Sequence, residues 1–195
     1  FGRLDGHLTR DEAIAHIRGI VAATELPVSA DFENAFADAP SDVAANAALV
    51  CDTGVAGFSV EDYAGRVADT IYDFDLAVER VAAAAEGAHR GDAHVVLTAR
   101  AENLLHGRTD RADTIARLQA YRAAGADVLF APGLTSADDI KAVVDACDGP
   151  VNVLAVPGVP PVAELRAIGV ARVSVGGAFA ALALGAAADA AHQLL

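Results

Sequence analysis

The chain has 195 residues, a length that predicts one domain with a sizeable hydrophobic core. Its net charge of −13 argues against a nucleic-acid partner, because phosphate contacts need clustered Lys and Arg. No stretch free of charge reaches ~18 apolar residues, so we expect no membrane span. The chain has 2 cysteines and shows no signal-peptide pattern, so we expect a cytoplasmic protein with buried free thiols at Cys51 and Cys147.

Helical and strand patterns alternate along the whole chain. A capping box, Thr9 with Glu12, begins the first helix. In chain order we predict helix 10–24, strand 27–31, helix 40–51, strand 57–61, helix 75–88, strand 95–100, helix 112–124, strand 127–131, helix 136–147, strand 151–155, helix 161–168, strand 172–175 and helix 178–195. This alternation predicts a parallel sheet with right-handed crossovers.

The fold class that follows is α/β, and we favour a (β/α)8 TIM-type barrel. No Gly-x-Gly-x-x-Gly follows a strand, so the dinucleotide-binding fold lacks its fingerprint. A barrel needs eight strands, however, and the patterns supply only six. We therefore expect residues 1–195 to form one N-terminally incomplete barrel domain that lacks its first two strands.

Charged residues follow three successive strands at the point where each strand ends. Asp31 closes the first strand, Glu61 the second and Arg100 the third. Strands buried on both faces should be continuously apolar, so these charges need a reason. In α/β sheets, ligands bind at the carboxyl ends of the strands. We therefore expect two carboxylates and a guanidinium to meet at one edge of the sheet. The sole lysine, Lys141, lies in a predicted helix, which argues against Schiff-base chemistry.

Several motifs together resemble the isocitrate lyase/phosphoenolpyruvate mutase superfamily, most closely its phosphoenolpyruvate phosphonomutase-like bacterial branch. The motifs are VSADFEN at 28–34, VED at 60–62, LTARAEN at 97–103, GADVLFAPG at 125–133 and PVNVLA at 150–155. The resemblance covers essentially the whole chain. It implies a modified barrel, a dimer or tetramer that exchanges its last helix, and Mg2+-dependent making or breaking of C–C or P–C bonds in 2-oxo acids. It also implies a strand, a helix and a second strand before this chain begins.

The resemblance assigns roles to the three strand-end residues. Asp31 matches the second aspartate of the family's Asp-x-Asp metal motif, with Ser29 in place of the first, and Glu61 matches another member of the metal shell. Arg100 matches the catalytic arginine that binds the substrate's carboxylate or phosphonate. Mg2+ takes oxygen ligands and often only one or two carboxylates, so Asp31 and Glu61 suit it. Alternatively, the carboxylates are helix caps or ion-pair partners, and Arg100 forms a structural ion pair with Glu33 or Glu102.

Residues after Arg100 are further candidates for substrate binding. Glu102 and Asn103 would hold the arginine or line the mouth of the site, and His106 would bind substrate, act in proton transfer or gate the site. A solvated role is the alternative for His106. His94 precedes its strand and is expected at the opposite end of the sheet, in a structural role.

Two departures from the family pattern limit the choice of reaction. Loop 63–72 takes the place of the family's gating loop, but its residues 64–70 include no Cys, Lys or His. Ala131-Pro132-Gly133 stands where the lyases carry a Glu. We therefore expect a Mg2+-dependent lyase that cleaves a C–C bond in a small 2-oxo or 2-hydroxy carboxylic acid through an enolate. The alternatives are a phosphonomutase or phosphonopyruvate-type enzyme, and a non-catalytic metabolite-binding relative or inactive fragment. The apolar helix 178–195 predicts a homo-oligomer.

Overall fold

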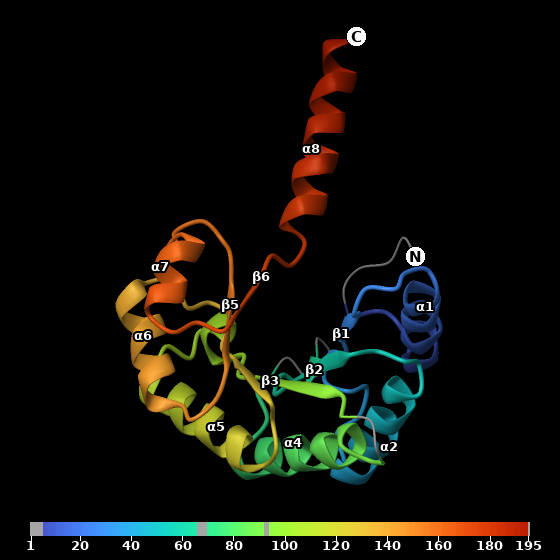
Figure 1. The fold of residues 1–195 in the computed structure, drawn as a ribbon, viewed down its shortest axis with the longest axis vertical. Helices are drawn as coiled ribbons and strands as arrows, with labels where there is room; N and C mark the ends of the chain where they lie inside the picture. Colours follow the sequence, from blue (N-terminus) through green and yellow to red (C-terminus); the bar gives the residue numbers. More distant parts are fainter. Residues whose placement is uncertain (1–5, 66–69, 92–93, 195) are drawn as a thin grey trace.

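A computed structural model describes residues 6–65, 70–91 and 94–194, which form one curled parallel sheet with helices on its outer face (Figure 1). Adjacent strands pair in chain order. The strands are β1 (Ser29–Asp31), β2 (Gly57–Glu61), β3 (Val96–Arg100), β4 (Val128–Phe130), β5 (Val151–Leu154) and β6 (Arg172–Ser174). This arrangement confirms the predicted alternation of helices and parallel strands. Within the described ranges the sheet remains open, because β1 and β6 are its edges.

The helices lie close to the predicted positions. They are α1 (Arg10–Ala22), α2 (Pro40–Cys51), α4 (Phe74–Ala88), α5 (Arg111–Ala123), α6 (Ala137–Ala146), α7 (Val162–Ala167) and α8 (Ala178–Gln193). The capping box that begins α1 is present, with the Thr9 side chain accepting from the Glu12 N–H. Between β3 and α5, where the pattern predicts no helix, Asn103–His106 forms a 3-10 helix.

The core fills the space between the sheet and the outer helices. Its largest fully buried apolar side chains include those of Phe32, Phe58, Leu97, Leu129 and Ile140. These residues lie in or next to four different strands and on α6, so the core spans most of the sheet. This packing fixes the spacing of the strands, and hence of the charged residues that follow them.

A glycine sets the close contact between α2 and α4. A Cβ atom built on Gly87 of α4 would lie 2.6 Å from the Cβ of Ala47 on α2, too short for two carbon atoms. The helix therefore needs glycine here although glycine weakens helix interiors.

The last helix, α8, extends away from the rest of the chain (Figure 1). None of its residues is buried, and Phe179, Leu182 and Leu184 are each about 70% exposed, at 68%, 71% and 72%. An apolar helix with no packing partner on the same chain is a candidate interface. In the part of the chain that the structure describes, no helix is both long and apolar enough to span a membrane.

The two cysteines differ in their burial. Cys147 is buried, as predicted, whereas Cys51, the last residue of α2, is only half-buried, so the expectation of full burial was wrong for it. Both are free thiols.

Candidate active site

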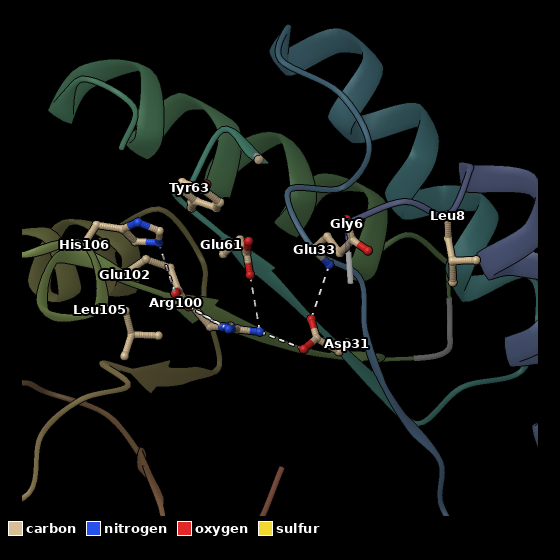
Figure 2. A pocket seen from close by; sticks show the side chains of 11 residues that line it. Gly6, Leu8, Asp31, Glu33, Glu61, Tyr63, Arg100, Glu102, Leu105 and His106 are labelled. Atoms are coloured by element: carbon tan, nitrogen blue, oxygen red, sulfur yellow. Dashed lines mark hydrogen bonds and ion pairs between the residues drawn. The ribbon is translucent and has the colours of Figure 1, made fainter. Parts of the chain in front are cut away.

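The three strand-end residues meet at one edge of the sheet, as Figure 2 shows. The parallel register places Glu61 of β2 directly beside Arg100 of β3. Arg100 Nη1 lies 2.8 Å from Asp31 Oδ2 and 3.3 Å from Glu61 Oε2. Arg100 Nη2 and Nε lie 2.7 and 2.8 Å from Glu102 Oε1. One guanidinium thus contacts three carboxylates that come from three strand ends.

A cavity of about 630 Å³ opens beside this group (Figure 2). Asp31, Glu61 and Arg100 form its charged wall, together with Glu33 and Glu102. The rest of its lining comes from the N-terminal segment and the loops after β2 and β3, namely Gly6, Leu8, Tyr63, Gly65, Leu105 and His106. The volume suits a small ligand, and the lining predicts a polar one.

The charges in this wall do not balance. Burial raises the pKa of Glu61 to about 8, and the neighbouring carboxylates Glu102 and Asp31 add to this effect, although Arg100 opposes it. Burial also raises the pKa of Glu102, and Arg100 lowers it only in part. The pKa of Arg100 is itself raised, because its three carboxylate partners outweigh the effect of burial. The wall holds four carboxylates and one guanidinium, so ionisation of Glu61 adds to a surplus of negative charge that a bound cation would neutralise.

The donor set fits a hard divalent cation. Asp31 and Glu61 offer carboxylate oxygens at neighbouring strand ends, and the Asp31 side chain is 67% exposed, so an ion that enters the cavity can reach it. Mg2+ takes oxygen ligands, keeps several waters and needs few protein carboxylates. Asp31 and Glu61 are therefore the residues that could hold Mg2+.

The turn after β1 orients Asp31. Its Oδ1 accepts from the Glu33 N–H and the Ser59 hydroxyl, each at 3.3 Å. Glu33, Ala35 and Phe36 have positive φ angles of 48°, 60° and 54°, which non-glycine residues rarely adopt. Such backbone strain persists only where surrounding contacts enforce it.

Arg80 of α4 supplies those contacts. Its guanidinium donates to the carbonyl oxygens of Asn34, at 2.6 Å, and Asp38, at 2.8 Å, and also to that of Ala37. It also lies 4.0 Å from the ring centroid of Tyr72. A buried arginine thus fixes the turn that follows Asp31. The sequence patterns did not single out Arg80, because it looks like an ordinary charge on a helix.

A second buried charge network joins the ends of β2 and β3. Asp62 Oδ1 accepts from the Glu102 N–H at 2.8 Å, and Asp62 Oδ2 accepts from Tyr121 Oη at 2.6 Å and Arg117 Nη1 at 3.0 Å. Asp62 and Arg117 are almost fully buried, at 3% exposure each. Asp62 therefore positions the backbone of Glu102, which in turn holds Arg100. The VED motif drew attention to Asp62 in the sequence. No sequence pattern indicated its two partners on α5, Arg117 and Tyr121.

The remaining predicted residues occupy different positions. The His106 ring stacks on Tyr63 with 3.9 Å between centroids, and its Nε2 lies 4.0 Å from Glu102 Oε2 at the cavity wall. Asn103, in contrast, is fully buried outside the cavity lining, and its amide donates to Asp113 at 2.5 Å. The structure brings His106 to the cavity wall and buries Asn103 next to it. Residues 66–69 of the expected gating loop lie outside the described residues.

A second hollow of about 440 Å³ continues from Asp31 and Arg100 towards the concave face of the sheet. Arg172 of β6 lies there, donating to Thr98 Oγ1 and Asn152 Oδ1 at 2.9 Å each. Because these side chains hydrogen-bond to one another, we interpret them as structural groups on the concave face of the sheet.

Comparison with known proteins agrees with this geometry. The phosphoenolpyruvate phosphomutase family model matches residues 1–195. A candidate lyase/mutase from Burkholderia cenocepacia J2315 has a crystal structure with a TM-score of 0.92 and 52% identity, covering 96% of this chain and 68% of that one. An uncharacterised Mycobacterium tuberculosis protein is 32% identical over 99% of this chain and 71% of its own length.

A relative with an assigned activity is more distant. The 2-methylisocitrate lyase of Escherichia coli K12 is 30% identical over 152 residues, which are 75% of this chain and 50% of the lyase. The chain thus spans about half the length of this relative. The family match extends from end to end of the chain, and the chain belongs to the phosphoenolpyruvate phosphomutase family of the isocitrate lyase/phosphoenolpyruvate mutase superfamily.

Proposed function

We propose that the protein is a Mg2+-dependent lyase that cleaves a C–C bond in a small 2-oxo or 2-hydroxy carboxylic acid through an enolate. The observation that carries the proposal is the contact of Arg100 with Asp31, Glu61 and Glu102 on the wall of one cavity. Family membership and the lyase relative support the reaction class. The substrate, the metal and the direction of the reaction are parts of the proposal.

Asp31 and Glu61 would hold the ion, and a bound Mg2+ would supply positive charge that stabilises enolate oxygen. Ion binding requires the carboxylate form of Glu61, so the cation would displace the proton that burial favours. The Arg100 contacts with Asp31 and Glu61 would then weaken in favour of the incoming acid.

Arg100 would bind the substrate carboxylate. A planar guanidinium can make two parallel hydrogen bonds to a carboxylate, which fixes its orientation as well as its charge. Glu102 Oε1 contacts Nε and Nη2 on one edge of the guanidinium, so Nη1 and the outer N–H of Nη2 are the pair that an incoming acid would meet beside the two candidate metal ligands. His106, stacked on Tyr63, would close one side of the site over the acid.

We further propose that the open sheet is part of an eight-stranded barrel and that two more strands would close it between β1 and β6. The open edges at β1 and β6 and the greater length of the relatives support this proposal. Assays of activity should therefore use the full-length protein.

The test is release of pyruvate or another small oxo acid from a panel of acids that includes oxaloacetate and 2-methylisocitrate. We expect turnover with Mg2+, none after chelation, and a loss of at least about 100-fold in kcat/KM for Arg100→Ala. The Glu25→Gln variant, which changes an exposed carboxylate elsewhere, is the control. Absence of metal-dependent turnover across the panel would contradict the lyase proposal.

The second candidate is P–C bond chemistry, and the family match to phosphoenolpyruvate phosphomutase is the observation that favours it. Arg100 would bind a phosphonate as readily as a carboxylate. Phosphorus NMR of phosphonopyruvate incubated with the protein and Mg2+ distinguishes the two, because only this candidate changes the phosphorus signal.

A further inference from the structure

Two histidines and an aspartate meet at the end of the sheet opposite the cavity. His89 follows α4, His94 precedes β3 and Asp127 precedes β4, so all three lie at the amino ends of the strands. His89 Nε2 lies 2.9 Å from Asp127 Oδ2, and His94 Nε2 lies 2.9 Å from Asp127 Oδ1. The two imidazole rings stack almost in parallel, with 4.3 Å between centroids and 9° between planes.

The backbone holds the carboxylate in place between the rings. Asp127 Oδ2 accepts from the Leu97 N–H at 2.8 Å, while the Asp127 N–H donates to the Leu97 carbonyl at 2.9 Å. The His89 N–H donates to the Ala85 carbonyl at the end of α4. The site is thus assembled from the residue after α4 and the residues just before β3 and β4. The His94 side chain is 59% exposed, so an ion can reach the cluster from solvent.

The donor atoms match a borderline transition metal. One ligand atom from each residue lies within 4.8 Å of the others, and a tetrahedral ion, whose ligand atoms lie about 3.4 Å apart, would draw them closer together. Two imidazole nitrogens and a carboxylate are ligands that Zn2+ takes with tetrahedral geometry at about 2.0–2.2 Å, whereas Mg2+ takes oxygen ligands.

We propose that His89, His94 and Asp127 form a transition-metal site that is selective for Zn2+ over Mg2+. A bound ion would link the end of α4 to the residues that precede β3 and β4. Each histidine would give the lone pair of Nε2 to the ion and carry its ring proton on Nδ1, with water completing the coordination. The site shares no residue with the proposed active site, so the two proposals can fail independently.

The alternative is a purely hydrogen-bonded triad in which each imidazole donates its Nε2–H to the carboxylate. This arrangement would explain the two 2.9 Å contacts without a metal. It predicts no specific uptake of Zn2+, so metal binding distinguishes the two.

The experiment is titration of Zn2+ into the chelator-treated full-length protein in excess Mg2+, which occupies carboxylate sites. We expect one tightly bound Zn2+ and, at about 100 times the dissociation constant, a rise in Tm of about 5–10 °C. Co2+ in place of Zn2+ should give the intense visible bands of four-coordinate cobalt. His94→Gln and His89→Gln should each weaken binding at least about 10-fold, as loss of a ligand requires.

The matched control is His192→Gln, which changes an exposed histidine on α8 whose Nδ1 contacts the Ala188 carbonyl of the same helix, far from the proposed site. It should bind Zn2+ like the parent. The proposal is overturned if the parent takes up no Zn2+ in excess Mg2+, or if His94→Gln and His89→Gln bind it as tightly as the parent. If Asp31→Asn, rather than the histidine variants, abolishes Zn2+ uptake, the ion binds in the cavity, and this result would also overturn the proposal.

Discussion

Replacement of Glu61 by Gln should stabilise the metal-free protein while it removes a proposed metal ligand. Glu61 lies among carboxylates, and its pKa is raised from 4.5 to about 8, chiefly by burial. Between these pH values the folded state keeps a proton that the unfolded state has lost. The parent therefore loses stability as the pH rises from about 4.5 to 8, and it loses no more above 8. Glutamine has nearly the same shape and no charge, so the stability of Glu61→Gln should not fall in this way as the pH rises.

The size of the effect follows from the same values. The interval between 4.5 and about 8, at about 1.4 kcal/mol per pH unit, sets an upper limit of about 5 kcal/mol. The Glu61 side chain is 13% exposed in an open cavity, so water screens part of the repulsion and we expect about 2 kcal/mol at pH 8. For a chain of this length that corresponds to a rise in Tm of about 4–8 °C. Arg100 keeps its contacts with Asp31 and Glu102 in the variant.

The assay is unfolding by heat or urea in chelator at pH 8 and at pH 4.5, with Glu25→Gln as the exposed control. The stabilisation should be present at pH 8 and nearly absent at pH 4.5, and added Mg2+ should stabilise the parent but not Glu61→Gln. If Glu61→Gln is no more stable than the parent at pH 8, then the cavity wall carries no surplus of negative charge and the argument for a cation there fails.

Three further predictions concern other parts of the chain. Arg100→Lys keeps the charge but loses the two parallel hydrogen bonds, so oxalate affinity measured by calorimetry should fall about 10–100-fold; unchanged affinity would contradict a guanidinium-specific role. Asp62→Asn removes the buried charge partner of Arg117, which keeps its ion pair with the partly exposed Asp113, so urea unfolding should show a loss of about 2–3 kcal/mol, and a loss below about 1 kcal/mol would mean that the network is not tightly coupled. Leu182→Asp with Leu184→Asp on α8 should lower the mass measured by light scattering to that of a monomer, whereas a monomeric parent would contradict an interface at α8.

Strands and the charged residues at their ends could be predicted from the sequence, because the pattern of apolar and charged residues along the chain determines them. Glu61 and Arg100 end apolar runs, and the predicted strand 57–61 coincides with β2. Since parallel strands end at one edge, their meeting with Asp31 could be predicted without any knowledge of the turn geometry. The six-stranded parallel order followed from the same alternation.

Features that depend on contacts between distant residues could not be predicted in this way. Arg80 and Arg117 look like surface charges on helices, yet both are buried because each satisfies groups on another element. Asn103 was a candidate for substrate binding because it lies three positions after Arg100. The 3-10 helix turns its amide towards Asp113. His94 was expected at the opposite end, where the structure places it, but nothing local indicated the pairing with a residue 33 positions away.

The most direct test of the central claim is calorimetric titration of oxalate, a mimic of enolpyruvate, into the full-length protein with and without Mg2+. If Asp31, Glu61 and Arg100 form one site, oxalate should bind only with Mg2+, and Glu61→Gln should abolish that binding. Oxalate binding that ignores Mg2+, or that survives Glu61→Gln unchanged, would contradict a shared metal and acid site. Absence of binding under all conditions would remove the basis for the proposed reaction.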